Sequence, residues 1–402
     1  MSETSTARAR VLIVGGGIGG LAAALALARG GIGVQLLEQA GTIGEIGAGI
    51  QLAANAFNAL DALGVGDAAR GRAVLTDTLQ MRDALDAREV ARIDVGPAYR
   101  QRFGNPYAVI HRADLHLSIL DAVRAHPLIA MRTGTQVRAL EQDPRGVTAV
   151  DQHGKRYRAD AAIGCDGVKS AIRAALIGDA HRVTGHVVYR AVVDARNMPD
   201  DLRLNAPVVW AGPRCHLVHY PLRGGQQYNL VVTFHSRDAE TWGVREGSRA
   251  EVLSYFDGIH PLPRRLLDRP TSWKRWATAD RDPVERWSTG RATVLGDAAH
   301  PMTQYLAQGA CQALEDAVTL GAAVARAGGD FEAAFALYER ARIPRCARVL
   351  YSAREMGRIY HAEGVERSVR NRLWTDRTQT QFHDALHWLH GWRAEDCLKG
   401  AD

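Results

Sequence analysis

The stretch Val11-Leu-Ile-Val-Gly-Gly-Gly-Ile-Gly-Gly20 decides the fold of this chain. An apolar strand runs directly into the pattern G-x-G-x-x-G, formed by Gly15, Gly17 and Gly20, and an alanine-rich helix is expected to continue to Arg29. The first glycine permits a tight turn, the second lets backbone approach a pyrophosphate, and the third allows close packing of helix on strand. The N–H groups at the start of the helix then face the phosphates.

A second predicted strand, residues 34–38, ends in Glu38, where a carboxylate can accept a hydrogen bond from a ribose hydroxyl. The order of strand, glycine turn, helix, strand and acid is typical of a dinucleotide-binding unit. We favour this interpretation over a glycine-rich turn in an ordinary α/β unit.

The chain has 402 residues, of which 46% are hydrophobic and 23% charged. This length exceeds what one core usually supports, so two domains are expected, and the composition is that of a globular protein. Residues 11–28 form an apolar segment, but five glycines among the first ten argue for a nucleotide fold and against a signal peptide or membrane span. We expect a cytoplasmic protein without a membrane span.

Cysteines and charge exclude other classes of protein. The five cysteines show no C-x-x-C motif, which argues against a disulfide framework or a cysteine-bound metal. The net charge of +6 comes from basic residues spread along the chain, so no nucleic-acid partner is expected. His383, His387 and His390 share one helical face at a spacing that could hold a metal, but nearby tryptophans favour a packing face. No metal is expected.

Two further motifs each place an acid on a glycine turn after a predicted strand. They are Gly164-Cys-Asp-Gly-Val-Lys-Ser-Ala-Ile-Arg173 and Gly296-Asp-Ala-Ala-His-Pro301. Ligands bind at such strand ends in open α/β sheets, although either motif alone could be an Asx turn. With the first motif, the three in this order resemble the single-component FAD-dependent aromatic hydroxylases, the class A flavoprotein monooxygenases. The resemblance covers the chain from Val11 to its helical C-terminus.

The resemblance implies an α/β fold in which a Rossmann-like FAD-binding domain of the glutathione-reductase type is interleaved with a mixed β-sheet substrate domain. The series of predicted β-strands between about residues 183 and 236 agrees with such an insertion. We expect the FAD-binding domain in residues 1–75, 107–182 and 277–330. The substrate domain is expected in residues 76–106 and 183–276, and a helical C-terminal segment in 331–402.

The resemblance also implies which residues hold the cofactor. The first glycine motif and Glu38 hold the ADP half of FAD, Asp297 bonds the ribityl chain, and the helix opening near Gly309 and Ala310 points at the flavin ring. Arg112 lies near the pyrophosphate, and the second motif contacts both FAD and the nicotinamide nucleotide. The expected cofactor-binding residues are Gly15, Gly17, Gly20, Glu38, Arg112, Asp166, Arg173, Asp297, Gly309 and Ala310.

The chemistry of the family sets what the substrate pocket must supply. A nicotinamide nucleotide reduces the flavin, O₂ adds to it, and the resulting flavin hydroperoxide transfers a hydroxyl group to an electron-rich ring. The protein excludes water, orients the ring and helps to ionise a phenol whose pKa is about 10. Family habit favours NADH. No short motif reads a 2′-phosphate, so NADPH remains the alternative.

Candidate bases lie on the predicted strand 215–222. Alternation places His216, Val218 and Tyr220 on one face, and Leu217 and His219 on the other. Alternation alone does not tell which face meets the flavin, and a histidine in a half-buried strand can simply be a packed residue.

A closer resemblance selects His216. His216 with Tyr220, together with Gln304 and Tyr107, resembles the branch of the family that hydroxylates 3-hydroxybenzoate. There the matching histidine assists deprotonation of the phenol, and the glutamine and tyrosines position the substrate. We therefore expect His216, Tyr220 and Gln304 to be catalytic, and Tyr107 to bind substrate with them.

The expected reaction is hydroxylation of 3-hydroxybenzoate para to its hydroxyl group, giving 2,5-dihydroxybenzoate (gentisate). The first alternative is salicylate 1-hydroxylation or action on another hydroxybenzoate, and the second is a flavoprotein that reduces isoprenoid chains. The expected partners are a small aromatic acid and O₂. A homodimer is expected because Trp374, Trp388 and Trp392 in the helical C-terminus could dock a second chain.

Overall fold

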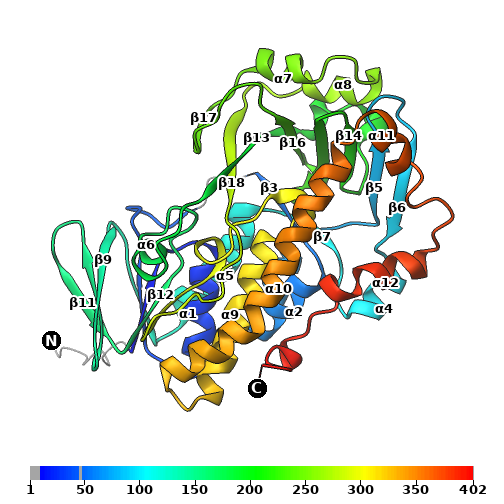
Figure 1. The fold of residues 1–402 in the computed structure, drawn as a ribbon. Helices are drawn as coiled ribbons and strands as arrows, with labels where there is room; N and C mark the ends of the chain where they lie inside the picture. Colours follow the sequence, from blue (N-terminus) through cyan, green and yellow to red (C-terminus); the bar gives the residue numbers. More distant parts are fainter. Residues whose placement is uncertain (1–9, 45–47, 402) are drawn as a thin grey trace.

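The computed structural model describes residues 10–44 and 48–401 (Figure 1). Its nucleotide-binding half contains a five-stranded parallel sheet in the order β19-β12-β1-β2-β8. The first motif lies at the carboxyl end of β1, the central strand, and the other two motifs follow its neighbour β12 and the edge strand β19. The strands are β1 (Val11–Val14), β2 (Val34–Leu37), β8 (Ile129–Arg132), β12 (Ala161–Gly164) and β19 (Ala292–Val294).

Helix α1 (Ile18–Arg29) follows the first motif, and its leucines and most of its alanines are buried under the helices α9 (Gly309–Arg326) and α5 (Arg112–Ala125). Gly15 has φ +109°, and a Cβ on Gly20 would lie 2.0 Å from the Gly15 carbonyl oxygen. Only glycines therefore allow strand, turn and helix to pack this closely.

A three-stranded antiparallel sheet, β9-β10-β11, projects beside α6 (Ala171–Leu176) (Figure 1). In sequence this sheet lies between β8 and β12 of the parallel sheet. A second small sheet has the order β3-β7-β4 and packs against the substrate half. The strands are β3 (Gly49–Leu52), β4 (Val74–Leu75), β7 (Ala108–His111), β9 (Val137–Asp143), β10 (Gly146–Asp151) and β11 (Arg156–Ala159).

The substrate half is an eight-stranded mixed sheet in the order β17-β18-β13-β16-β15-β14-β5-β6. One face is covered by α7 (Arg249–Tyr255) and α8 (Pro261–Leu267), around a core that includes Trp210 and Phe234 (Figure 1). The strands are β5 (Thr78–Asp83), β6 (Glu89–Asp94), β13 (Arg182–Asp194), β14 (Val208–Gly212), β15 (Cys215–Leu222), β16 (Gln227–His235), β17 (Gly243–Glu246) and β18 (Lys274–Asp280).

The C-terminal part is helical, as expected. Helix α10 (Phe331–Tyr360) runs from the nucleotide-binding half to the substrate half, and α12 (Gln379–His390) packs on α4 (Pro97–Phe103) (Figure 1). None of the helices in the described ranges is both long and apolar enough to cross a membrane. The remaining helices are α2 (Ala54–Ala62), α3 (Gly66–Arg72) and α11 (Gly364–Arg370).

A buried charge network joins α9, α10 and the turn after β19. Asp316 accepts hydrogen bonds from Arg342 Nε at 2.6 Å and from the Gly296 N–H at 3.1 Å, and it pairs with His300 Nε2 at 2.5 Å. Arg342 also donates to Glu315 at 2.5 Å. These neighbours overcome the burial that opposes ionisation, so the pKa of Asp316 falls to about 2 and that of His300 rises well above its ordinary value.

Substitution Arg342→Met is expected to lower the free energy of unfolding by about 3 kcal/mol, because each of the buried carboxylates Glu315 and Asp316 loses one of its two cationic partners. Urea denaturation followed by circular dichroism measures this change. Arg358→Met on the same helix removes an exposed pair with Glu366 and should cost about 1 kcal/mol or less. Equal losses in the two variants would show that the network contributes no more than a surface pair.

Candidate functional site

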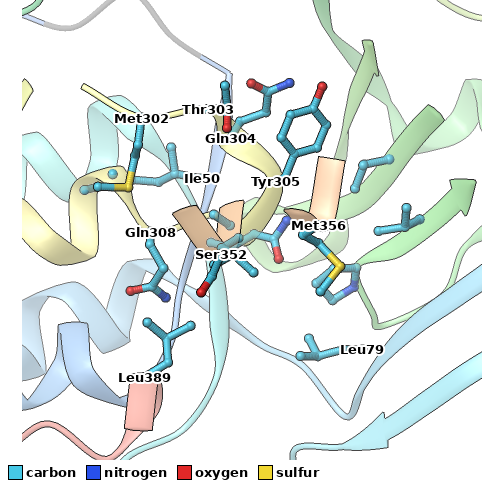
Figure 2. Close-up of a pocket in the computed structure, with 18 of the residues that line it drawn as sticks. Ile50, Leu79, Met302, Thr303, Gln304, Tyr305, Gln308, Ser352, Met356 and Leu389 are labelled. Atoms are coloured by element: carbon cyan, nitrogen blue, oxygen red, sulfur yellow. The ribbon is translucent and has the colours of Figure 1, made fainter. Parts of the chain in front are cut away.

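A cavity of about 890 Å³ lies between the parallel sheet and the open face of the eight-stranded sheet. Side chains from distant parts of the chain surround it: Met302 and Gln304 precede α9, Leu79 comes from β5, and Met356 comes from α10 (Figure 2). Nine of the residues predicted from the sequence line this cavity: Gly17, Tyr107, Arg112, His216, Tyr220, Asp297, Gln304, Gly309 and Ala310.

The glycine motif forms the nucleotide end of the cavity. Helix α1 has Gly17 as its N-cap and no side-chain cap, so its first N–H groups are left for a ligand. Glu38 accepts hydrogen bonds from the N–H groups of Gly16 at 2.6 Å and Ala40 at 2.7 Å. Its carboxylate is thereby held beside the turn, with lone pairs left over for a hydroxyl group.

Asp166 and Arg173 do not line the cavity. Asp166 accepts hydrogen bonds from Ser170 Oγ at 2.5 Å and from the Ala171 N–H at 2.7 Å, and burial raises its pKa. Arg173 is fully buried, pairs with Asp179 at 2.7 Å, and donates to the Ala298 carbonyl at 3.0 Å. Both side chains fix the start of α6, and Arg173 ties it to the turn that carries Asp297.

Asp297 and the start of α9 lie on the cavity wall. Helix α9 begins at Gly309, and its N-cap Gln308 makes no side-chain cap. Instead the Gln308 side chain accepts from Asn55 Nδ2 at 2.9 Å and from Gln312 at 3.0 Å. The positive end of an 18-residue helix therefore faces the cavity with free N–H groups.

The register of β15 decides between its two histidines. His219 is fully buried on the far face, where it contacts Trp210 and the Leu202 carbonyl. His216 lies on the cavity face, and its Nδ1 is 2.7 Å from Nε2 of His361. Burial and neighbouring imidazoles lower the pKa of His216 to about 3, so its ring is neutral.

The other predicted substrate residues are held by specific contacts. Gln304 Nε2 donates to Thr233 Oγ1 on β16 at 3.1 Å, and the Tyr107 hydroxyl donates to Gln51 Oε1 at 2.7 Å. The buried ring of Tyr220 packs over Gly49, where an added Cβ would lie 2.5 Å from the ring. The three side chains thus reach one cavity from different elements.

Arg190 on β13 was not predicted. It pairs in register with Val231, which pairs with Val218, so Arg190 shares the sheet face of His216 and Tyr220. It lines the cavity and makes no ion pair within the described part of the chain. Burial and the neighbouring Arg112 lower its pKa. The sequence carried a signal for it: in Val188-Tyr-Arg190-Ala-Val192 the arginine shares one strand face with two valines, which indicates a charged side chain on an otherwise apolar face.

The three C-terminal histidines lie on α12. His383 Nε2 is 2.8 Å from the Asp94 carbonyl, and His390 Nδ1 is 2.9 Å from the Tyr99 hydroxyl. These contacts and the ring of Phe103 pack α12 onto α4. Within residues 10–44 and 48–401, the side-chain groups arranged closely enough for a metal ion do not include them.

Known proteins resemble this chain over its length. The family described as FAD binding domain matches residues 8–353. A 3-hydroxybenzoate 6-hydroxylase from Klebsiella oxytoca is 63% identical over 390 residues, covering 97% of this chain and 98% of the relative. A salicylate hydroxylase substrate complex is 27% identical with a TM-score of 0.82, and 99% of each chain is covered. HpxO from Klebsiella pneumoniae, complexed with FAD and uric acid, is 25% identical with a TM-score of 0.84, covering 97% and 99%.

The low pKa of His216 predicts a pH dependence of stability. Below about pH 6.5 the unfolded chain binds a proton at this histidine that the folded protein does not bind, so stability falls by about 1.4 kcal/mol per pH unit as acid is added. His216→Asn should make the stability slope between pH 6 and 5 shallower by about this amount in urea titrations. The exposed His153→Asn serves as control and should keep the wild-type slope. An unchanged slope in His216→Asn would contradict the assignment.

Proposed function

This chain belongs to the FAD binding domain family, and we propose that it hydroxylates 3-hydroxybenzoate para to the hydroxyl group. The products are 2,5-dihydroxybenzoate and water, and the reaction consumes NADH and O₂. The observation that carries the proposal is that His216, Tyr220 and Gln304 line one cavity beside a nucleotide-binding turn, in a chain 63% identical to such a hydroxylase.

The residues on the cavity wall fit FAD. A Cβ on Gly20 would clash with the Gly15 carbonyl oxygen, so the close turn that faces the diphosphate requires glycine. The uncapped N-termini of α1 and α9 offer N–H groups to the diphosphate and to the flavin ring. Gly17, Arg112 and Asp297 on the cavity wall, together with Glu38 beside the glycine turn, would hold the nucleotide and ribityl parts. When bound, FAD reduced by NADH activates O₂ and supplies the hydroxyl group. Asp166 and Arg173 would act through the turns that they fix.

His216 would receive the phenolic proton of the substrate. Its Nδ1 is engaged with His361, and no hydrogen bond to its Nε2 is found among the described residues, which leaves Nε2 for the cavity. A neutral imidazole at the pH of the reaction can accept a proton from a phenol within hydrogen-bond reach. The resulting phenolate is more electron-rich and accepts the hydroxyl group more readily.

Arg190 supplies a partner for the carboxylate. Two strand spacings separate β15 from β13, or about 10 Å at ~4.8 Å per strand. A benzoate lying over Val218 and Val231 would extend from His216 toward the guanidinium of Arg190. Gln304, oriented by Thr233, and the tyrosines Tyr107 and Tyr220 would position the ring between them.

The two alternative reactions would use the same FAD-binding fold. Salicylate hydroxylation is supported by the likeness to a salicylate hydroxylase complex, but at lower identity than the 3-hydroxybenzoate relative. A flavoprotein that reduces isoprenoid chains would need an apolar groove, and the arginine, histidine and glutamine on this cavity do not suit one.

We further propose a cytoplasmic location and a homodimer. All five cysteines are free thiols, which fits the cytoplasm, where NADH is supplied. Val365, Val369 and Leu373 are exposed around α11, and this apolar surface supports a homodimer. Of the expected tryptophans, Trp374 and Trp388 line the cavity instead.

The test is product analysis of the purified protein with FAD and NADH on 3-hydroxybenzoate, salicylate and 4-hydroxybenzoate. We expect NADH oxidation with the first compound to give 2,5-dihydroxybenzoate. Catechol and CO₂ from salicylate would instead establish the first alternative. No stimulation by any of the three would reject the hydroxybenzoate assignment.

Substitution Arg190→Gln is expected to weaken binding of 3-hydroxybenzoate about 30-fold, the equivalent of ~2 kcal/mol for a lost charge partner. Binding of the neutral 3-hydroxybenzamide should change little. Perturbation of flavin absorbance on titration measures both affinities. Arg196→Gln, just beyond β13 and exposed, is the matched control. Equal weakening for acid and amide would show that Arg190 does not face the carboxylate.

A further inference from the structure

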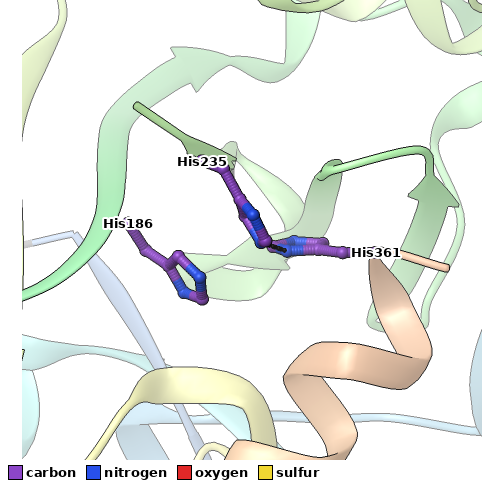
Figure 3. Close-up of side chains that lie close together, drawn as sticks. All are labelled: His186, His235 and His361. Carbon is purple, nitrogen blue, oxygen red and sulfur yellow. Dashed lines mark hydrogen bonds between the residues drawn. The ribbon is translucent and has the colours of Figure 1, made fainter. Parts of the chain in front are cut away.

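His216 is the inner end of a chain of three hydrogen-bonded imidazoles. Its Nδ1 lies 2.7 Å from Nε2 of His361, and Nδ1 of His361 lies 2.8 Å from Nε2 of His235. The three come from β15, the C-cap of α10 and the end of β16. Figure 3 shows the contact between His235 and His361, with His186 beside them.

The chain runs from the cavity toward the surface. His216 and His361 are buried, at 2% and 5% exposure, whereas His235 is half-buried at the end of its strand. Two backbone hydrogen bonds hold His361 in place: its N–H donates to Gly357 at 3.1 Å, and its carbonyl accepts from Arg214 at 3.0 Å. His361, which lies far from the three glycine motifs in sequence, is thereby fixed between the cavity and solvent.

We propose that the chain His216–His361–His235 conducts the phenolic proton of the bound hydroxybenzoate from the cavity to solvent. This inference rests on the proposed function. His361 and His235 act through His216 and are therefore positioning residues for its basicity.

The transfer balances without another reactant. The phenolic O–H bond breaks and its proton binds Nε2 of His216, while the proton on Nδ1 of His216 moves to Nε2 of His361. The Nδ1 proton of His361 moves to Nε2 of His235, and the Nδ1 proton of His235 passes to water. Each imidazole ends neutral in its other tautomer. Protonation of the product phenolate through the same chain restores the starting tautomers.

The charges around the chain favour conduction over storage. The pKa values of all three imidazoles are lowered, mainly by burial, so each ring carries a single proton at neutral pH and none is an imidazolium. The rings of Tyr305 and Tyr360 lie against His216, and the ring of Tyr305 also lies against His361. Other charged groups shift the pKa values at the outer end. Arg214 and Glu363 have opposite effects on the pKa of His235. His186 lies beside the chain, and Asp280 and Arg182 have opposite effects on its pKa.

A metal ion is the competing use of this cluster, since nitrogens of His186, His235 and His361 lie within 4.8 Å of one another. Imidazole lone pairs lie in the ring plane, however, and the rings of His186 and His235 stack at 4.2 Å with a 17° angle. Two stacked rings do not direct lone pairs at a common ion. Both nitrogens of His361 are also engaged, and Nδ1 of His186 lies 2.5 Å from the Tyr305 hydroxyl.

The experiment mixes oxidised, FAD-loaded protein with 3-hydroxybenzoate in a stopped-flow instrument without NADH. A pH indicator reports proton release, and ultraviolet absorbance reports the bound phenolate. In wild type, we expect a proton to appear in solution as the phenolate forms. In His361→Ala, substrate affinity should stay within about 3-fold, release should slow at least 10-fold, and added imidazole should restore it. His235→Gln should slow release similarly, and the exposed control His153→Asn should not.

The outcomes separate the two proposals. If wild type neither binds nor ionises 3-hydroxybenzoate, the proposed function fails. If wild type ionises and hydroxylates it while His361→Ala releases its proton at the wild-type rate, the relay alone is overturned. Stoichiometric Zn²⁺ in the purified wild type that is lost in His361→Ala would also overturn the relay, in favour of a metal site.

Discussion

The buried carboxylate of Asp316 is the contact on which both halves of the site depend. It binds the Gly296 N–H, His300 and Arg342 at once, so it joins the turn after β19, the helix α9 and the helix α10. The turn carries Asp297, and the loop after it carries Gln304. The far end of α10 carries His361. One desolvated charge therefore sets the cofactor end of the cavity and the element that supports its base.

The eight-stranded sheet supplies the opposite wall through simple alternation. Residues on β13, β15 and β16 that pair in register point to the same side, which brings Arg190, His216 and Thr233 onto one face although they are far apart in sequence. The other face is filled by a hydrophobic core around Trp210. The sheet thus separates the polar chemistry from the core that stabilises it.

Much of the frame was predictable because its signals are local. The glycine turn with its helix, the strand that ends before Glu38 and the strand 215–222 all depend on neighbouring residues, and the structure confirms them. Alternation also placed His216 and His219 on opposite faces. The choice between them needed the partner strands, which a single strand does not reveal. Roles in the site remain predictions for all the residues named.

The residues that sequence reasoning missed act over long separations. Arg190 lies in a strand whose partner was not assigned, and His361 follows a long helix, 145 positions after His216. For the motif around Asp166 and Arg173, the alternative of an Asx turn describes the hydrogen bonds of Asp166, whereas the position of both side chains off the cavity wall could not be read from the motif. Side-chain partners of this kind depend on the packing of whole elements.

Helix α10 also fixes the distance and the rotation between two of its anchored residues. Nineteen positions separate Arg342, fixed to Asp316, from His361, fixed to His216. At about 1.5 Å and 100° per residue, inserting or deleting one residue between them would turn one anchor by just over a quarter of the way around the helix axis. The length of this segment is therefore fixed by its two anchors. An inserted residue is better accommodated at the Gly328-Gly329 turn before the helix, where both glycines have a positive φ and the two anchors would keep their relative positions.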